Sequence, residues 1–318
     1  MKWLITILLF ISSVQANKII KPYGFIKASG DVIDMVIKDD MLLVSTDKGT
    51  IESYSLSTKK ELMKIEFPMI KDFMGDSIYP KVFSTDYLKK SKRYLAVVQG
   101  SSGSRELFVL KDGVKTKLID EKEKLFISKA KFIDENHIII ALLSHEYILF
   151  DINHKKSLYR IHVNYSHFSD FMLSEDKKTL IDSCESGEIS ILDVNNGNVV
   201  RTLKGGNLDN VYKVDVKKGK VLCAGQDRRG IVYDLDTGSY DRFDANFLIY
   251  AGALSPSAKK AAFAFTEDND IVIFSLYSKE RVYTLKGQKS TLNSIVFIDE
   301  NSLVSGSDDE YIMMWKLK

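Results

Sequence analysis

Residues 306–318, GSDDEYIMMWKLK, decide the fold. Gly306 and Ser307 are small, and the acidic residues after them are typical of a turn. The run that follows is rich in β-forming residues and closes on the aromatic Trp315. The stretch therefore predicts a polar turn followed by a β-strand, and the rest of the chain can be searched for copies of this unit.

The same unit recurs upstream at a regular spacing. Strand-like runs close on residues that stand 41 positions apart, at Trp315, Phe274, Tyr233 and Leu192. Turn aspartates keep the same spacing, at Asp309, Asp268 and Asp227. Phe150 lies 42 positions before Leu192, Tyr54 ends a further clear copy, and a poorer copy between them ends at Val109. A period of this length, repeated seven times, indicates a repeat architecture.

Each copy contains the same sequence of short elements. After the closing residue come a turn, a short strand that often ends in Leu, a polar loop and two more strands, as in RVYTLKGQKSTLNSIVF and NSLVSGS. Four short strands per repeat, separated by turns, are typical of a propeller blade. The sequence therefore predicts an all-β fold, a seven-bladed β-propeller, with residues 17–318 as a single domain.

The last repeat needs a fourth strand from elsewhere in the chain. Residues 306–318 supply its third strand, and an unpaired strand edge is an aggregation hazard. The stretch KPYGFIKASGDV aligns with RVYTLKGQKST, which is a fourth strand followed by a loop. We expect residues 22–27 to complete the last blade and close the ring.

The last repeat also resembles the WD-repeat family, and the resemblance spans essentially the whole chain after residue 16. In that family a loop His, a strand Ser, a turn Asp and a Trp form a hydrogen-bonded set in each blade. The matching positions here are Gln288, Ser305, Asp309 and Trp315. Gln replaces His, and no other copy keeps the Trp. The resemblance implies a propeller closed by an N-terminal strand.

Residues 1–16, MKWLITILLFISSVQA, differ from the rest of the chain. A cationic start at Lys2, a short apolar run, and small residues at Val14 and Ala16 are typical of a cleaved secretory signal peptide. The alternative is an uncleaved anchor, but the run is short for a membrane span. No Cys precedes Cys184 to accept a lipid. We expect a periplasmic, monomeric protein that begins at Asn17 and has no stable membrane anchor.

Charge and motifs argue against several function classes. The net charge is +2, so nucleic-acid binding is not expected. The sequence lacks a phosphate-binding Gly-rich loop, a zinc-protease helix motif, a nucleophile elbow and a haem-attachment motif. Acidic turns at residues 267–270 and 308–310 are explained by capping of backbone N–H groups. We therefore expect no catalytic residues, no cofactor and no metal.

The cysteines and histidines give no ligand-like spacing. Cys184 and Cys223 occupy second strands of neighbouring blades with the same side-chain parity, so we expect free, buried thiols. His145, His162 and His167 fall on one rim of the propeller. A metal or haem contact there is one interpretation. Ordinary surface and strand-end histidines are the interpretation that the spacing favours.

One insertion breaks the regular period. Tyr54 and Val109 stand 55 positions apart, and the excess falls in residues 68–81, PMIKDFMGDSIYPK, between blades one and two. Its apolar residues make it unusual for a loop, and mixtures of Met and aromatic residues suit protein contacts. The candidate partner-binding residues are Met69, Phe73, Met74 and Tyr79. The alternative is that the insertion packs on its own propeller rim.

Two function classes follow from these features. The first is a non-catalytic periplasmic scaffold that binds protein partners. The signal, the length and the blade count resemble those of accessory proteins encoded with periplasmic nitrate reductases, which implies a reductase component as partner. An outer-membrane assembly scaffold is an alternative within this class. The second class is a propeller enzyme of lactonase or quinone-cofactor type, which would need charged residues converging on the central channel or Trp-rich blades.

Overall fold

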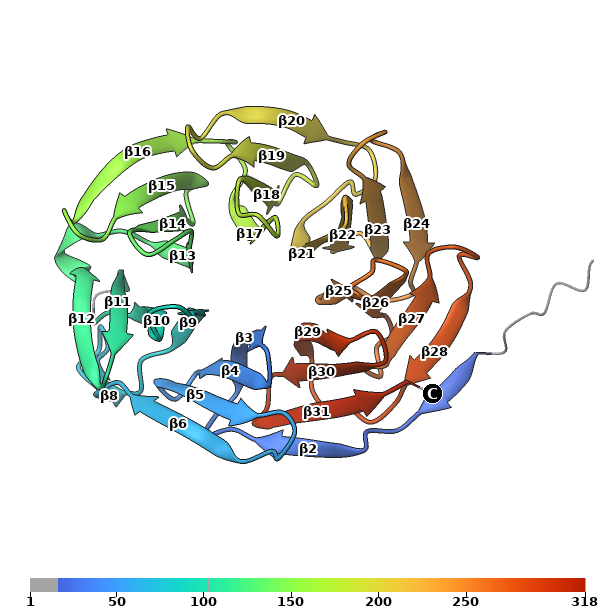
Figure 1. Cartoon of the computed structure of the whole chain (residues 1–318), viewed down its shortest axis with the longest axis horizontal. Coiled ribbons are helices and arrows are strands. Elements are labelled where there is room, and N and C mark those ends of the chain that lie inside the picture. Colours follow the sequence, from blue (N-terminus) through green and yellow to red (C-terminus); the bar gives the residue numbers. More distant parts are fainter. Residues whose placement is uncertain (1–16, 102, 318) are drawn as a thin grey trace, which may run out of the picture.

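The computed structural model describes residues 17–101 and 103–317, so the expected signal peptide, residues 1–16, lies outside the described residues. Seven β-sheets surround a central axis and form a closed ring (Figure 1). The predicted all-β, seven-bladed propeller is confirmed. No helix within the described ranges is long and apolar enough to cross a membrane.

The blades follow one another in chain order, with the first strand of each blade innermost (Figure 1). The strands of blades one to three are β3 (Val32–Lys38), β4 (Met41–Thr46), β5 (Thr50–Ser55), β6 (Glu61–Glu66); β9 (Val82–Leu88), β10 (Arg93–Gln99), β11 (Arg105–Lys111), β12 (Val114–Ile119); β13 (Ile127–Phe132), β14 (His137–Leu142), β15 (Glu146–Asp151), β16 (Lys156–His162). Those of blades four and five are β17 (Phe168–Leu173), β18 (Thr179–Cys184), β19 (Ile189–Asp193), β20 (Val199–Leu203); β21 (Val211–Lys217), β22 (Lys220–Gly225), β23 (Arg229–Asp234), β24 (Tyr240–Asp244). Those of blades six and seven are β25 (Gly252–Leu254), β26 (Lys260–Ala264), β27 (Ile271–Ser275), β28 (Arg281–Leu285); β29 (Leu292–Asp299), β30 (Ser302–Ser307), β31 (Tyr311–Lys316). A short 3-10 helix, Glu121–Glu123, precedes blade three.

Middle and outer strands differ in burial because of their place in the ring. The middle strand β5 is buried at all six positions, since its two faces pack against neighbouring blades. Most residues of the outer strand β6 are exposed and the others are half-buried, because one side of this strand faces solvent. This difference in burial explains why each repeat has apolar second and third strands and a more polar fourth strand.

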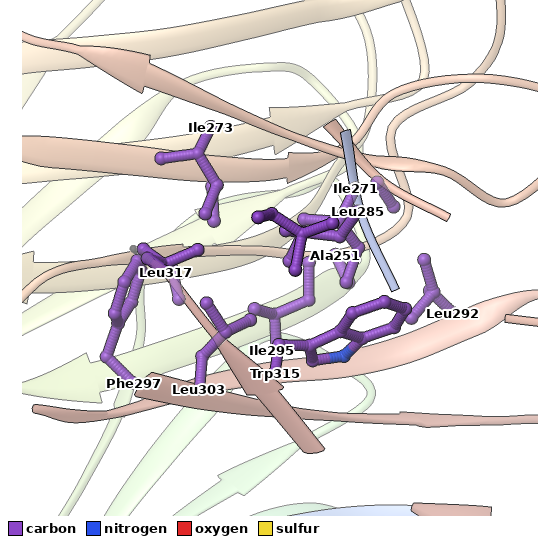
Figure 2. Packing of buried hydrophobic residues seen from close by; sticks show 14 of the residues in the cluster. Ala251, Ile271, Ile273, Leu285, Leu292, Ile295, Phe297, Leu303, Trp315 and Leu317 are labelled. Carbon is purple, nitrogen blue, oxygen red and sulfur yellow. The ribbon is translucent and has the colours of Figure 1, made fainter. Parts of the chain in front are cut away.

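The core lies between adjacent blades. Buried apolar side chains from blades six and seven form one continuous cluster (Figure 2). The indole of Trp315 is fully buried there, with Leu292 and Ile295 beside it in Figure 2. Six further clusters join other parts of the ring in the same way. Burial between blades, rather than within one blade, therefore holds the ring together.

The ring closes through an N-terminal strand, as predicted. β2 (Gly24–Lys27) pairs antiparallel with β31 and supplies the fourth strand of blade seven. The predicted residues 22–27 begin slightly earlier, because Pro22 has no N–H to donate and pairing starts when the Tyr23 N–H donates to the carbonyl of Met314. A second strand, β1 (Lys18–Ile20), lies parallel to β28 and makes blade six five-stranded. The sequence did not predict β1.

The insertion contains a small hairpin. β7 (Ile70–Lys71) pairs antiparallel with β8 (Ser77–Ile78), and both lie between β6 and β9 in the chain. The Asp72 carboxylate accepts hydrogen bonds from the N–H groups of Met74 and Asp76, each at 2.9 Å. The turn of the hairpin is therefore held by its own side chain.

Candidate functional site

Chain direction divides the loops of the propeller between two rims. Successive strands in a blade are antiparallel, so the turns between second and third strands lie at the same end as the links between blades. We call this end the insertion rim, because the link at residues 68–81 belongs to it. The opposite rim carries the remaining turns of each blade. Every candidate contact residue predicted from the sequence therefore lies on the insertion rim.

The hairpin presents its apolar side chains to solvent. Phe73 is 93% exposed and Met74 is 74% exposed, while Met69 and Tyr79 are about half exposed. The alternative, in which the insertion packs on its own rim, does not describe the two tip residues. Large apolar side chains with this exposure are a marker of an interaction surface when they cluster.

Exposed apolar side chains continue along the same rim. The next three links, between blades two and three, three and four, and four and five, carry one each. Together with the hairpin they form what we call the apolar arc: Met69, Phe73, Met74, Tyr79, Phe126, Tyr165 and Leu208. The links 286–291 and 28–31 contain no large apolar residue, and in the link 245–251 the large apolar side chains are half-buried or buried. The arc therefore spans one side of the insertion rim.

A small cavity opens within the arc. Its volume is about 300 Å³, and Leu125, Phe126 and Leu143 supply apolar walls. Arg160 and His167 lie at its border. Both have carboxylate partners, since Arg160 contacts Glu146 at 2.7 and 2.9 Å and His167 contacts Glu185 at 2.9 Å. The cavity is wide enough for one apolar side chain, and the exposed Lys124 adds a third basic residue to its lining.

The four residues that match the WD-repeat set are brought together in blade seven. Trp315 Nε1 donates to Ser305 Oγ at 2.8 Å, and Ser305 Oγ donates to Gln288 Oε1 at 2.7 Å. Gln288 reaches Asp309 through Ser307, whose hydroxyl accepts from Gln288 at 2.5 Å and donates to Asp309 at 2.9 Å. Sequence reasoning missed Ser307. Gln occupies the loop position as both donor and acceptor, so the chain of hydrogen bonds remains continuous.

One histidine differs from the favoured expectation of ordinary surface histidines. His145 is fully buried between blades three and four, where its Nε2 lies 2.7 Å from Asp182 Oδ2. Its Nδ1 lies 2.8 Å from the carbonyl oxygen of Ser166, and Tyr147 donates to Asp182 Oδ1 at 2.6 Å. A carbonyl oxygen only accepts, so Nδ1 carries a hydrogen and a single proton joins Nε2 to Asp182.

The groups around His145 determine the direction in which its pKa is shifted. Burial alone would lower the pKa of His145, but the hydrogen bond and the negative charge of Asp182 outweigh it and raise the pKa. His162 and His167 are exposed and fit the surface interpretation. Within residues 17–101 and 103–317, no group of three or more His, Cys, Asp or Glu is arranged to hold a metal ion.

Inner-strand aspartates join neighbouring blades around the central axis. Each accepts a hydrogen bond from a backbone N–H of the next blade, at 2.8 to 3.1 Å. The pairs are Asp34 with Thr85, Asp86 with Phe132, Asp170 with Val214, and Asp215 with Leu254. A buried carboxylate with a backbone donor satisfies both groups. These aspartates therefore act as clamps between blades.

Lysines balance two of these carboxylates. Lys129 Nζ lies 2.7 Å from Asp170, and Lys131 Nζ lies 3.3 Å from Asp34. Burial would raise the pKa of Asp34, but the charges of Lys131, Lys129 and Lys213 lower it. Charged side chains thus converge on the axis, which a propeller enzyme would need. The hydrogen bonds and ion pairs described for these groups nevertheless run between blades.

Both cysteines are free and buried, as the strand parity predicted. Burial raises the pKa of the Cys184 thiol and also that of Cys223. A protonated thiol in an apolar site is a poor nucleophile and a poor metal ligand. Neither cysteine therefore adds to a candidate site.

Comparisons of the chain with protein families and with curated proteins do not identify its function. No protein-family model matches the chain, and no curated protein matches it. The apolar arc and its cavity are consequently the observations on which a function can be argued.

Proposed function

We propose that this protein is a non-catalytic module that binds another protein on its insertion rim. The observation that carries this proposal is the apolar arc, which extends from the β7–β8 hairpin over three further links. Single exposed apolar residues are ordinary, but a group on one rim marks a contact surface. The fold alone supplies a rigid platform and does not select a function.

The chemistry of the arc favours a folded protein with an apolar patch. Met side chains adapt their shape to a partner surface, and aromatic side chains bury a large area for few immobilised bonds. The cavity beside Phe126 can receive one apolar side chain from that surface. Arg160 and His167 at its border already have carboxylate partners, so we expect shape and apolar contact to contribute more than these two side chains do.

We place this module in the periplasm as an accessory to a nitrate reductase system, of the type called NapL. The support is the resemblance noted from the signal-like start, the chain length and the blade count. The role that follows is assistance in maturation or electron supply, without catalysis by the propeller. Titration of the mature protein with purified periplasmic nitrate reductase tests the partner. Absence of a complex at micromolar concentrations would remove this partner while leaving the binding rim open to others.

Substitution of the hairpin tests the rim itself. Replacing Met69, Phe73 and Met74 together with Ser should weaken partner binding by about 100-fold, because buried contact residues often contribute more than ~1 kcal/mol each. The melting temperature should stay close to that of the parent, since the tip side chains are solvent-exposed. Isothermal titration and thermal melting on the same variant measure both effects.

A matched control uses exposed apolar residues on outer strands. Leu62, Leu158 and Val200 are exposed away from the insertion rim, and their replacement with Ser should leave binding intact. A hairpin variant with unchanged affinity and a lowered melting temperature would show that the insertion stabilises the ring instead of docking a partner.

A further inference from the structure

A second cavity lies on the opposite rim, where the proposed docking surface does not reach. Its volume is about 550 Å³, and β22 of blade five and the strands and turns of blade six form its walls. Leu276, Tyr277 and Val282 provide apolar surface. Volumes of this size are typical of sites for small molecules or for one or two peptide side chains.

Three lysines surround this cavity and are only partly neutralised. Lys220 pairs with Asp234 at 2.6 Å. Lys260 Nζ donates to the backbone carbonyl of Glu300 at 2.6 Å, which satisfies a hydrogen bond without an ion pair. Lys259 is exposed, and its ammonium has no hydrogen bond or ion pair within the described residues.

Nearby carboxylates do not cancel this positive charge. Asp234 also accepts hydrogen bonds from the N–H groups of Asp236 and Thr237, so its negative charge is shared with its own turn. The Glu300 carboxylate accepts from the Ser257 N–H at 2.5 Å. The residues that line the cavity include three lysines and no Asp or Glu, so the cavity has a positive border above apolar walls.

We propose that this cavity binds a carboxylate attached to an apolar or aromatic body. The body would lie against Leu276 and Val282, and the carboxylate would meet the Lys259 ammonium. Tyr277 is exposed at the cavity border, where its ring can cover the bound group. Either a small organic acid or the C-terminal residue of a peptide supplies this chemistry. The proposal is independent of the insertion rim and of any partner bound there.

Equilibrium titration of the mature protein with 3-phenylpropanoate tests the site, with the uncharged 3-phenylpropan-1-ol as the matched ligand. We expect the acid to bind about tenfold more tightly than the alcohol, because it gains a charge-assisted hydrogen bond. Lys259→Gln should abolish that preference. A short peptide ending in phenylalanine, with a free or an amidated carboxyl terminus, distinguishes the sources. Tighter binding of the free peptide than of the small acid assigns a peptide terminus, and the reverse order assigns an organic acid.

The control variant is Lys178→Gln. Lys178 occupies the equivalent turn position in blade four, is exposed and lies outside the cavity, so the preference for the acid should persist. Tyr277→Ala should lower the affinity for both ligands without changing the fold, because the side chain is exposed. Equal affinity for acid and alcohol in the parent protein, or an unchanged preference in Lys259→Gln, would overturn the proposal.

Discussion

At the scale of single residues, the buried polar groups do more to specify the arrangement of blades than to supply chemistry. His145 and Asp182 belong to different blades and satisfy each other, with Tyr147 and the Ser166 carbonyl completing the set. A buried polar group without a partner would cost more than the pair contributes. The pair therefore favours one packing of blade three on blade four over a displaced one.

The His145–Asp182 pair predicts a pH dependence of stability. The folded-state pKa of His145 is raised, so its contribution is complete below the unfolded-state pKa, about 6.5, and is lost as pH rises through the folded pKa. As the pH is raised above 6, the parent should lose more thermal stability than the double variant His145→Gln, Asp182→Asn, which lacks both titrating groups. Parallel melting curves for the two proteins across this range would contradict the assignment.

The hydrogen-bonded set in blade seven gives a second prediction at this scale. Trp315→Phe removes the donor to Ser305 and should cost about 1–3 kcal/mol of unfolding free energy. A double-mutant cycle with Ser305→Ala isolates the hydrogen bond from the lost volume, and we expect a coupling energy of about 1 kcal/mol. Urea unfolding of the parent, the two single variants and the double variant gives the four unfolding free energies that the cycle needs. Additivity within a few tenths of a kcal/mol would show that the indole acts through packing alone.

At the scale of elements, the N-terminal segment contributes one strand to each of two blades. β2 completes blade seven, and β1 adds to the outer edge of blade six. Ile26 of β2 is buried in the cluster between blades seven and one, whereas Ile19 of β1 is exposed. Closure of the ring should therefore depend on β2 much more than on β1.

Two isoleucine substitutions separate the contributions of these strands. Ile26→Ala should lower the unfolding free energy by about 2–4 kcal/mol, because it leaves a cavity in a packed cluster. Ile19→Ala removes the same atoms from an exposed site and should cost less than about 0.5 kcal/mol. Chemical unfolding of both variants provides the comparison. Equal losses would mean that β1 and β2 close the ring together.

The strands that could be predicted are those with a long, repeated pattern. The third strands and their turn aspartates recur with a regular period, so the seven blades followed from spacing. The closing strand followed from the unpaired edge of the last repeat and from the alignment of residues 21–32 with residues 281–291. β1 has three residues, and β7 and β8 have two each. Strands of this length are too short to show a periodic pattern in the sequence. The His145–Asp182 contact joins residues 37 apart in different blades, and no local signal relates them. The inner-strand aspartates were detectable in principle, as acidic residues directly beside apolar residues in first strands such as β17 and β21.

At the scale of the whole molecule, the two rims differ in character. The insertion rim carries the apolar arc, and the opposite rim carries a cavity with a cationic border. The location of the insertion could be predicted from the sequence, but the extent of the arc could not. Phe126, Tyr165 and Leu208 are single residues in separate links, and only the ring brings those links to the same end.

The pairing of β2 with β31 also has a consequence for how the protein is made. Phe25 and Met313 are register partners 288 positions apart, so at ~5–20 residues per second roughly 15–60 s of translation separate them. Throughout that interval β2 has no partner, because β31 follows β29 and β30 and is the last strand of blade seven to be synthesised. A nascent chain can complete local hairpins early, but it cannot shield this edge until elongation reaches residue 311. Ribosome stalling shortly before that point should therefore yield an aggregation-prone intermediate that needs chaperones to stay in solution.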